Sequence, residues 1–186
     1  MQKFILVILT IILAGMTGTS AQTQQTKALT RKQIKAEQDT LDSLCFEQAR
    51  KAIADREFIL EADQVIFKYG TTAFVSANTN FVAIHGDKAV VQVAFNIPVS
   101  GPNGLGGVTV TGNVSSFRQS VDKRGNISVT MNVMGAGISA LVEISLPQGG
   151  NNASVYISPN FNANRFSLSG TLLPLSKANV FQGSSF

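Results

Sequence analysis

The chain has 186 residues and a formal net charge of +4, and its length suits a single domain once an export signal is removed. Eight of its eleven acidic residues lie between Glu37 and Asp63, so the remainder is nearly uncharged and owes its polarity to Asn, Ser, Thr and Gln. Such a surface lacks the basic stripe that nucleic acids require, which excludes nucleic-acid binding as the expected role.

The first 21 residues have the pattern of a signal peptide. Lys3 supplies the positive start, residues 4–14 are apolar apart from Thr10, and Ala21 ends a run of small residues that suits cleavage. A helix of that apolar length spans about 16 Å, which is well short of the ~30 Å hydrocarbon core of a bilayer. Gln22 stands where a lipoprotein would carry its modified cysteine. We therefore expect cleavage near Ala21 and release into the periplasm or the medium, with no membrane span afterwards.

An amphipathic helix is predicted after a short polar segment. Residues 22–29 carry no hydrophobic period, which predicts a flexible lead, and Thr30 has the character of a helix N-cap. From there to about Ala54, apolar residues recur every three or four positions, as in a helix packed on a sheet. Cys45, the only cysteine, is expected to be a buried thiol, and it cannot form an intrachain disulfide. The apolar face consists of Ile34, Leu41, Leu44, Cys45, Ala49, Ala52 and Ile53.

After Glu57 the apolar period changes to two, which predicts eight or nine short strands. The predicted strands cover residues 58–62, 65–69, 81–84, 89–97, 108–117, 127–134, 138–146, 153–157 and 165–172. Turn-forming residues at 85–88 and 122–126 join strands as hairpins.

Consecutive strands joined by short turns favour an antiparallel sheet, and a large sheet with one apolar face must close on itself. The predicted fold class is therefore α+β and mainly antiparallel β, with an N-terminal helix followed by an eight- or nine-stranded β-sandwich or barrel. The helix is expected to cover an open end or an edge. Residues 30–182 form this single domain, and residues 183–186 form a C-terminal tail.

A family resemblance rests on five separated runs, Phe58–Asp63, Asn78–Val82, Ala89–Phe95, Gly101–Gly107 and Pro159–Asn162. These runs resemble the DUF4251 family, whose function is unknown, and the likeness extends over about residues 41–180. The resemblance implies an exported protein of a Gram-negative bacterium. Some members of the family are lipid-anchored, so the missing lipid cysteine is a departure that favours the free periplasm. The resemblance supplies no catalytic residues.

Residue types that carry chemistry are scarce in this chain. His85, the only histidine, would have to serve any Ser-His-Asp or histidine-metal site, but it stands in a predicted hairpin turn. Glu61, Asp63 and Glu143 could supply the paired carboxylates of a glycosidase, although strand ends and exposed faces commonly carry such acids. The sequence thus predicts no catalytic residue, no metal site and no cofactor.

The most suggestive polar cluster consists of Asn160, Phe161, Asn162, Asn164 and Arg165. Amide side chains both donate and accept hydrogen bonds and an aromatic ring offers an apolar face, which suits sugar hydroxyls or a peptide backbone. Asparagine is also a frequent turn residue, so the same residues fit an ordinary loop. This loop is the place where a ligand is expected.

The chain is accordingly interpreted as an exported envelope protein with a non-enzymatic binding or structural role. Its expected partner is another envelope protein or a small ligand, either apolar or a glycan. The alternative is a carboxylate-dependent hydrolase that acts on envelope or dietary glycans. Histidine, cysteine and acidic residues are scarce in the part of the chain predicted to form strands, which favours the non-enzymatic role over the hydrolase.

Overall fold

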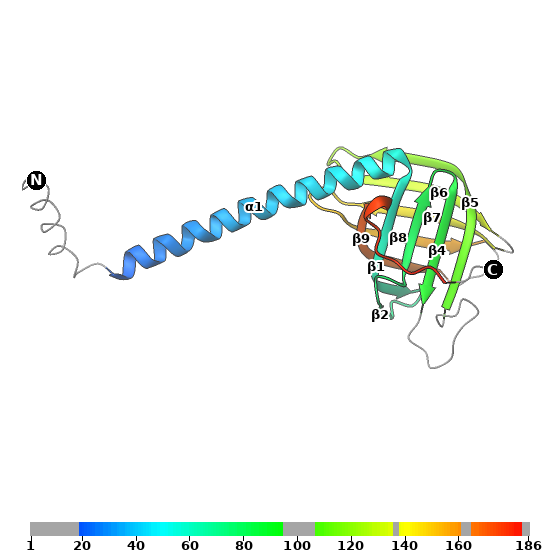
Figure 1. Cartoon of the computed structure of the whole chain (residues 1–186), viewed down its shortest axis with the longest axis horizontal. Coiled ribbons are helices and arrows are strands. Elements are labelled where there is room, and N and C mark those ends of the chain that lie inside the picture. The colour runs from blue at the N-terminus through cyan, green and yellow to red at the C-terminus, as the bar shows by residue number, and fades with distance from the viewer. Residues whose placement is uncertain (1–18, 95–106, 136–137, 161–164, 184–186) are drawn as a thin grey trace, which may run out of the picture. The chain divides into compact units, whose positions relative to one another are not determined.

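The computed structural model describes residues 19–94, 107–135, 138–160 and 165–183. Two compact units divide the chain, Met1–Leu41 and Asp42–Phe186, and their boundary falls inside helix α1 (Thr19–Asp55). The second unit contains the end of α1 and all the strands, and it is the part of the molecule that carries the fold (Figure 1).

Helix α1 begins earlier than the N-cap pattern at Thr30 predicts. It runs from Thr19 through residues 22–29, where the sequence indicated a flexible lead. Ala, Gln, Lys and Leu in this segment favour a helix, and neither Gly nor Pro interrupts it. Residues 22–29 therefore have a high helix propensity although they lack a hydrophobic period. None of the helices in the described ranges combines the length and the apolar character that crossing a membrane would require.

The packed face of α1 differs from the predicted one. In the second unit, the buried side chains of the helix are Phe46, Ala49, Ala52 and Ile53. Leu44, which was predicted to pack, is 55% exposed, and Cys45 is only half-buried. The buried face of the helix is thus rotated by about one residue from the predicted face, so that Phe46 is buried in place of Leu44. Burying the larger ring of Phe46 removes more apolar surface from water than burying Leu44 would.

The strands form a closed antiparallel barrel of eight strands with one additional strand (Figure 1). The elements are β1 (Glu57–Phe67), β2 (Thr72–Phe74), β3 (Phe81–His85), β4 (Lys88–Ala94), β5 (Gly107–Val121), β6 (Ile127–Gly135), β7 (Ile138–Leu146), β8 (Asn152–Pro159), β9 (Phe166–Pro174) and the 3-10 turn η1 (Leu175–Lys177). Neighbours follow the order β1-β3-β4-β5-β6-β7-β8-β9, and β9 pairs with β1 to close the barrel. Strand β2 continues the edge of β1 beyond β3. Closure decides between the two predicted architectures in favour of the barrel.

Because every pairing is antiparallel, the connections fall at two opposite ends of the barrel. The α1 end carries the helix, the start of β1, and the β3–β4, β5–β6 and β7–β8 turns. The opposite end, here called the loop end, carries the β1–β2 turn at 68–71 and the segment 75–80. It also carries the last residues of β4, β6 and β8 and the first residues of β5, β7 and β9.

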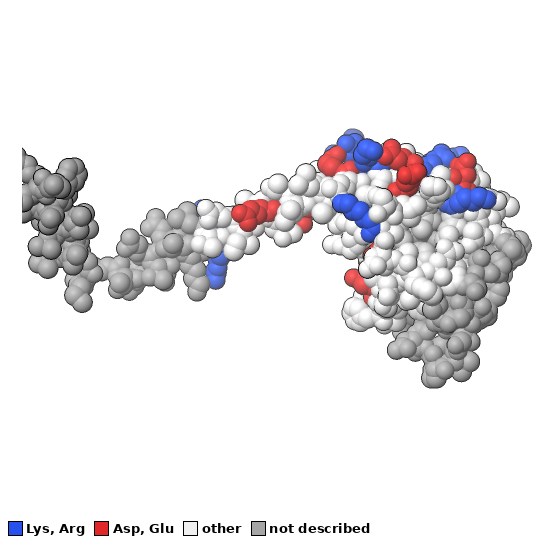
Figure 2. Space-filling model, viewed as in Figure 1, with Lys and Arg blue, Asp and Glu red and all other residues white. Residues whose placement is uncertain are grey.

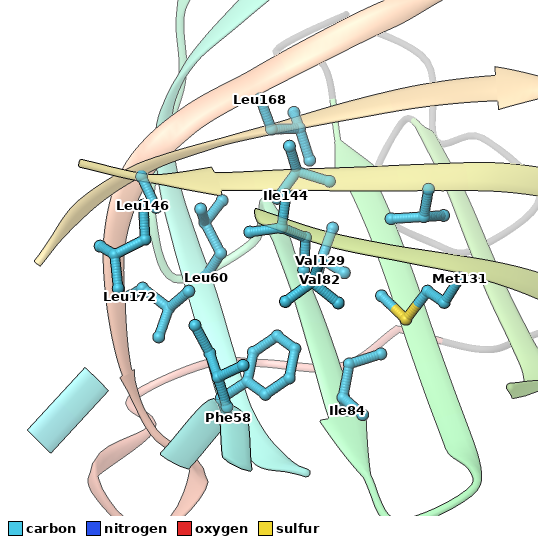
Figure 3. Close-up of a cluster of buried hydrophobic side chains, with 14 of the residues drawn as sticks. Phe58, Leu60, Val82, Ile84, Val129, Met131, Ile144, Leu146, Leu168 and Leu172 are labelled. Atoms are coloured by element: carbon cyan, nitrogen blue, oxygen red, sulfur yellow. The ribbon is translucent and has the colours of Figure 1, made fainter. Parts of the chain in front are cut away.

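Apolar side chains fill the barrel interior (Figure 3). Phe58, Leu60, Met131, Leu168 and Leu172 are among the side chains that point inward, and each is completely inaccessible to water. A barrel of eight strands is just wide enough for its own side chains to fill. Phe46 and Ile53 of α1 belong to the same apolar cluster, so the helix completes the core at the α1 end.

The C-terminal strap, residues 178–183, crosses the outer faces of β1, β3 and β4. Its backbone N–H groups at Asn179 and Phe181 donate to Glu61 Oε1 (2.8 Å) and to the carbonyl oxygen of Asn78 (2.7 Å). In Figure 1 the strap is the red trace that passes in front of these strands. The strap therefore covers apolar residues of the outer face, including the buried Phe81.

Candidate functional site

Charge divides the barrel into two unlike ends. On the face shown in Figure 2, basic and acidic side chains gather over the end of α1 and the hairpins beside it. The charged residues at the α1 end are Glu47, Arg50, Lys51, Asp55, Arg56, Glu57, Asp87, Lys88, Arg118, Asp122, Lys123, Arg124 and Lys177. Within the described ranges, the charged residues nearest the loop end are Asp63, Lys68 and Arg165.

Several charged side chains at the α1 end pair with one another. Arg56 joins the helix to the β3–β4 turn, since its guanidinium lies 3.1 Å from Asp87 and 4.6 Å from the ring centroid of Phe117. Asp122 closes the β5–β6 turn by accepting hydrogen bonds from the Asn126 side chain (2.8 Å) and backbone (2.9 Å). These bonds from Asn126 lower the pKa of Asp122 because they stabilise its carboxylate. This end has the character of a solvated structural surface.

The loop end presents aromatic side chains instead. Phe67 of β1 and Phe166 of β9 are paired across the two strands and lie half-buried against the interior cluster. Tyr69 and Phe74 belong to the β1–β2 hairpin and are 88% and 86% exposed. Exposed rings of this size leave apolar surface in water, and when they gather at one place they commonly mark a binding surface.

The two described ends of the predicted ligand loop lie at this same end. Asn160 is exposed, and its Nδ2 donates to Ser139 Oγ at 2.8 Å, so its amide anchors the loop to β7. Arg165 is exposed and directly precedes β9. Phe161, Asn162 and Asn164 lie outside the described residues, and the ligand role of the loop stays a prediction.

Basic residues adjoin the Phe67–Phe166 pair on both strands. Lys68 follows Phe67, and Arg165 precedes Phe166, where the β1–β9 ladder ends. The Lys68 ammonium lies 5.4 Å from the ring centroid of Tyr69, within cation–π range.

Sequence reasoning missed Tyr69 and Phe74. The sequence feature that could have indicated them is the presence of an aromatic residue on either side of Gly70. The φ of Gly70 is 81°, which allows the tight turn between β1 and β2. Whether such rings are buried depends on what covers the hairpin, which the local sequence does not specify.

The carboxylates of the alternative hydrolase interpretation are dispersed. Glu61 lies on the outer face of β1 and accepts a hydrogen bond from the strap, and Asp63 lies at a bulge in the same strand. Glu143 belongs to β7, with β8 and β9 between it and β1. The structure therefore does not bring Glu143 together with Glu61 and Asp63.

His85 lies directly before the β3–β4 turn, and not within the turn as its sequence context predicts. It ends β3, is exposed, and places Nδ1 3.7 Å from Glu57 Oε1. Within the described ranges, no group of three or more His, Cys, Asp or Glu side chains is arranged to hold a metal ion.

Comparison with known proteins gives a family and one closely similar structure. The family model described as "Domain of unknown function (DUF4251)" matches residues 40–172. The crystal structure of a DUF4251 family protein from Bacteroides eggerthii DSM 20697, at 1.95 Å resolution, is similar to this chain with 49% sequence identity and a TM-score of 0.67. That likeness covers 80% of this chain and 99% of the other. The search of curated proteins gave no match. The chain therefore belongs to the DUF4251 family, as the five runs of residues predict.

Proposed function

We propose that the protein is exported to the periplasm or the medium, has no catalytic activity, and binds a carbohydrate at the loop end of its barrel. The observation that carries this proposal is the exposure of Tyr69 and Phe74 on one hairpin at that end. Export is supported by the signal-peptide pattern of residues 1–21.

Carbohydrate chemistry matches the side chains at the loop end. A sugar ring has an apolar face of C–H groups, which packs on an aromatic ring, and a rim of hydroxyls, which both donate and accept hydrogen bonds. The segment 75–80 supplies the exposed side chains of Ser76 and Asn78, of which the Ser76 hydroxyl donates to Asn78 Oδ1 (2.7 Å). Asn160 adds a further exposed amide across the same end.

A binding role agrees with the rest of the barrel better than a catalytic role does. Apolar side chains pack the interior, so a ligand would have to occupy the rim and not a deep lumen. A glycosidase requires two carboxyl groups about 5–9.5 Å apart on either side of one bond. The acids on β1 and β7 have two strands between them and point away from the interior, which favours binding without hydrolysis.

Glycan binding by the mature protein tests the proposal. An oligosaccharide array identifies a ligand, and calorimetry then compares the unchanged protein with Tyr69→Ala/Phe74→Ala. Stacking on each exposed ring is worth roughly 0.5–1.5 kcal/mol, so we expect the double variant to bind about tenfold more weakly at an unchanged melting temperature.

Val121→Ala is the matched control, because Val121 is an exposed apolar residue at the opposite end. It should bind like the unchanged protein. Failure of every oligosaccharide to bind, or equal binding by the double variant, would contradict the proposal. Release of reducing sugar during the assay would instead support the hydrolase.

A further inference from the structure

We infer that the carbohydrate bound at the loop end carries a carboxylate, as a uronic acid does, and that Lys68 and Arg165 bind this group. The inference rests on the proposed function and narrows its ligand class. It comes from the proximity in the structure of these two basic residues, which are far apart in the sequence.

Strand register brings the two residues to one corner of the barrel. The β1–β9 ladder ends with Phe67 opposite Phe166, and Lys68 and Arg165 are the next residues on the two strands. Phe67 and Phe166 pack against the interior cluster, and this packing holds the backbone of the adjacent Lys68 and Arg165 in place. Side chains alternate along a strand, and Lys68 and Arg165 are accordingly exposed.

Two like charges at neighbouring positions of adjacent strands repel each other, which is unfavourable unless an anion lies nearby. At the α1 end, Arg50 pairs with Glu47 (2.6 Å) and Lys51 with Asp55 (2.7 Å), whereas Lys123 and Arg124, which lie in an exposed turn, form no ion pair with a described residue. Among the described residues, no carboxylate forms an ion pair with Lys68 or Arg165. Of the described residues, Asp63 has the only other charged side chain near the loop end, so this corner is a basic site.

The chemistry of the corner fits a carboxylated sugar. A guanidinium can bind both oxygens of a carboxylate with parallel hydrogen bonds, while an ammonium adds a point charge. Tyr69 lies beside Lys68, so a sugar packed on its ring would hold its carboxylate close to the ammonium. A nucleic acid would need several successive phosphate contacts, whereas this end offers two cations.

Paired acidic and neutral sugars test the inference on the full mature protein. The probes are trisaccharides of galacturonate, glucuronate and mannuronate, each compared by calorimetry with its carboxyl-reduced, neutral counterpart. Hydrogen bonds between ionised groups are roughly twice as strong as those between neutral groups, so at least one acidic probe should bind roughly tenfold or more tightly than its neutral counterpart. Lys68→Gln/Arg165→Gln should lower the ratio of acidic-probe to neutral-probe affinity to about one.

Lys123→Gln/Arg124→Gln is the matched control, since it removes one lysine and one arginine from an exposed turn at the α1 end. It should keep the full preference for the acidic probe. Equal binding of acidic and neutral probes would overturn the inference while leaving carbohydrate binding intact. Absence of binding to all sugars would overturn the proposed function and this inference together. Tighter binding of a thymidine hexanucleotide than of any uronate would overturn the inference in favour of nucleic acid.

Discussion

Gln92 shows how one buried residue ties the C-terminal strap to the barrel. Its side chain is 0% exposed, and its amide uses all of its hydrogen-bonding capacity. Nε2 donates to the carbonyl oxygens of Thr79 (2.9 Å) and Phe181 (2.8 Å). Oε1 accepts from Thr109 Oγ1 (2.9 Å) and from the backbone N–H of Gly183 (2.8 Å). A buried amide without these partners would be strongly unfavourable, so the strap and Gln92 depend on each other.

Replacing Gln92 by Leu should therefore destabilise the protein although the side-chain volume changes little. The substitution leaves the partners of the amide unpaired, and each buried unpaired group costs about 1–3 kcal/mol. We expect a loss of roughly 2–4 kcal/mol in the free energy of unfolding, measured by urea denaturation. Gln119→Leu, at an exposed position of β5, should change it by less than about 0.5 kcal/mol. Equal stabilities of the two variants would show that the strap does not depend on this amide.

Strand β1 shows what the sequence can and cannot predict about an element. The break at Asp63–Gln64 predicts two separate strands, but the structure contains one strand, Glu57–Phe67, with a bulge at that point. The bulge is possible because the facing residue on β9 is Gly170. A Cβ atom there would overlap the carbonyl oxygen of Glu61. Gly170, which allows the bulge, is more than a hundred residues away from it in the sequence. The local sequence of β1 therefore cannot predict that the strand continues through the bulge.

Gly170→Ala should consequently distort the β1–β9 pairing that closes the barrel. The added methyl group meets backbone atoms, which cannot move aside as a flexible side chain could. Overpacking of this kind costs about 1–3 kcal/mol, and chemical denaturation should register a loss in that range. Gly150→Ala is the control, because a Cβ there meets nothing within 4 Å. A stability loss at Gly150 as large as that at Gly170 would rule out the steric explanation.

At the scale of the whole molecule, periodicity predicts the strands but not their closure. Strand β6 matches its prediction nearly to the residue, because inward and outward side chains alternate along Ile127–Gly135. The barrel closes because its first strand, β1, pairs with its last strand, β9. The sequence of neither strand indicates this pairing, so the sequence could not distinguish a sandwich from a barrel. Composition predicts a ligand loop between Asn160 and Arg165, and that role stays a prediction. The exposure of Tyr69 and Phe74 could not be predicted, since it depends on which faces the finished barrel leaves uncovered.

The completed barrel has one end that packs against helix α1 and an opposite end at which we propose binding. Helix α1 completes the core at one end. Loops on the surface of a rigid scaffold can in general vary without disturbing its core. A rigid scaffold with ligand groups on its loops is a common arrangement in binding proteins. The proposed carbohydrate site uses the loop end for this reason.

Export is the remaining property of the whole chain, and it determines which ligands the protein can meet. If residues 1–21 are a signal peptide, the periplasmic product should begin near Gln22, and intact-mass measurement of that fraction should give the corresponding mass. Leu9→Lys places a charge inside the short apolar run, so it should leave uncleaved precursor in the cytosol. Leu29→Lys lies beyond the run and should be exported normally. A cytosolic product that retains Met1 in the unchanged protein would contradict export, and with it the encounter with extracellular glycans on which the proposed function depends.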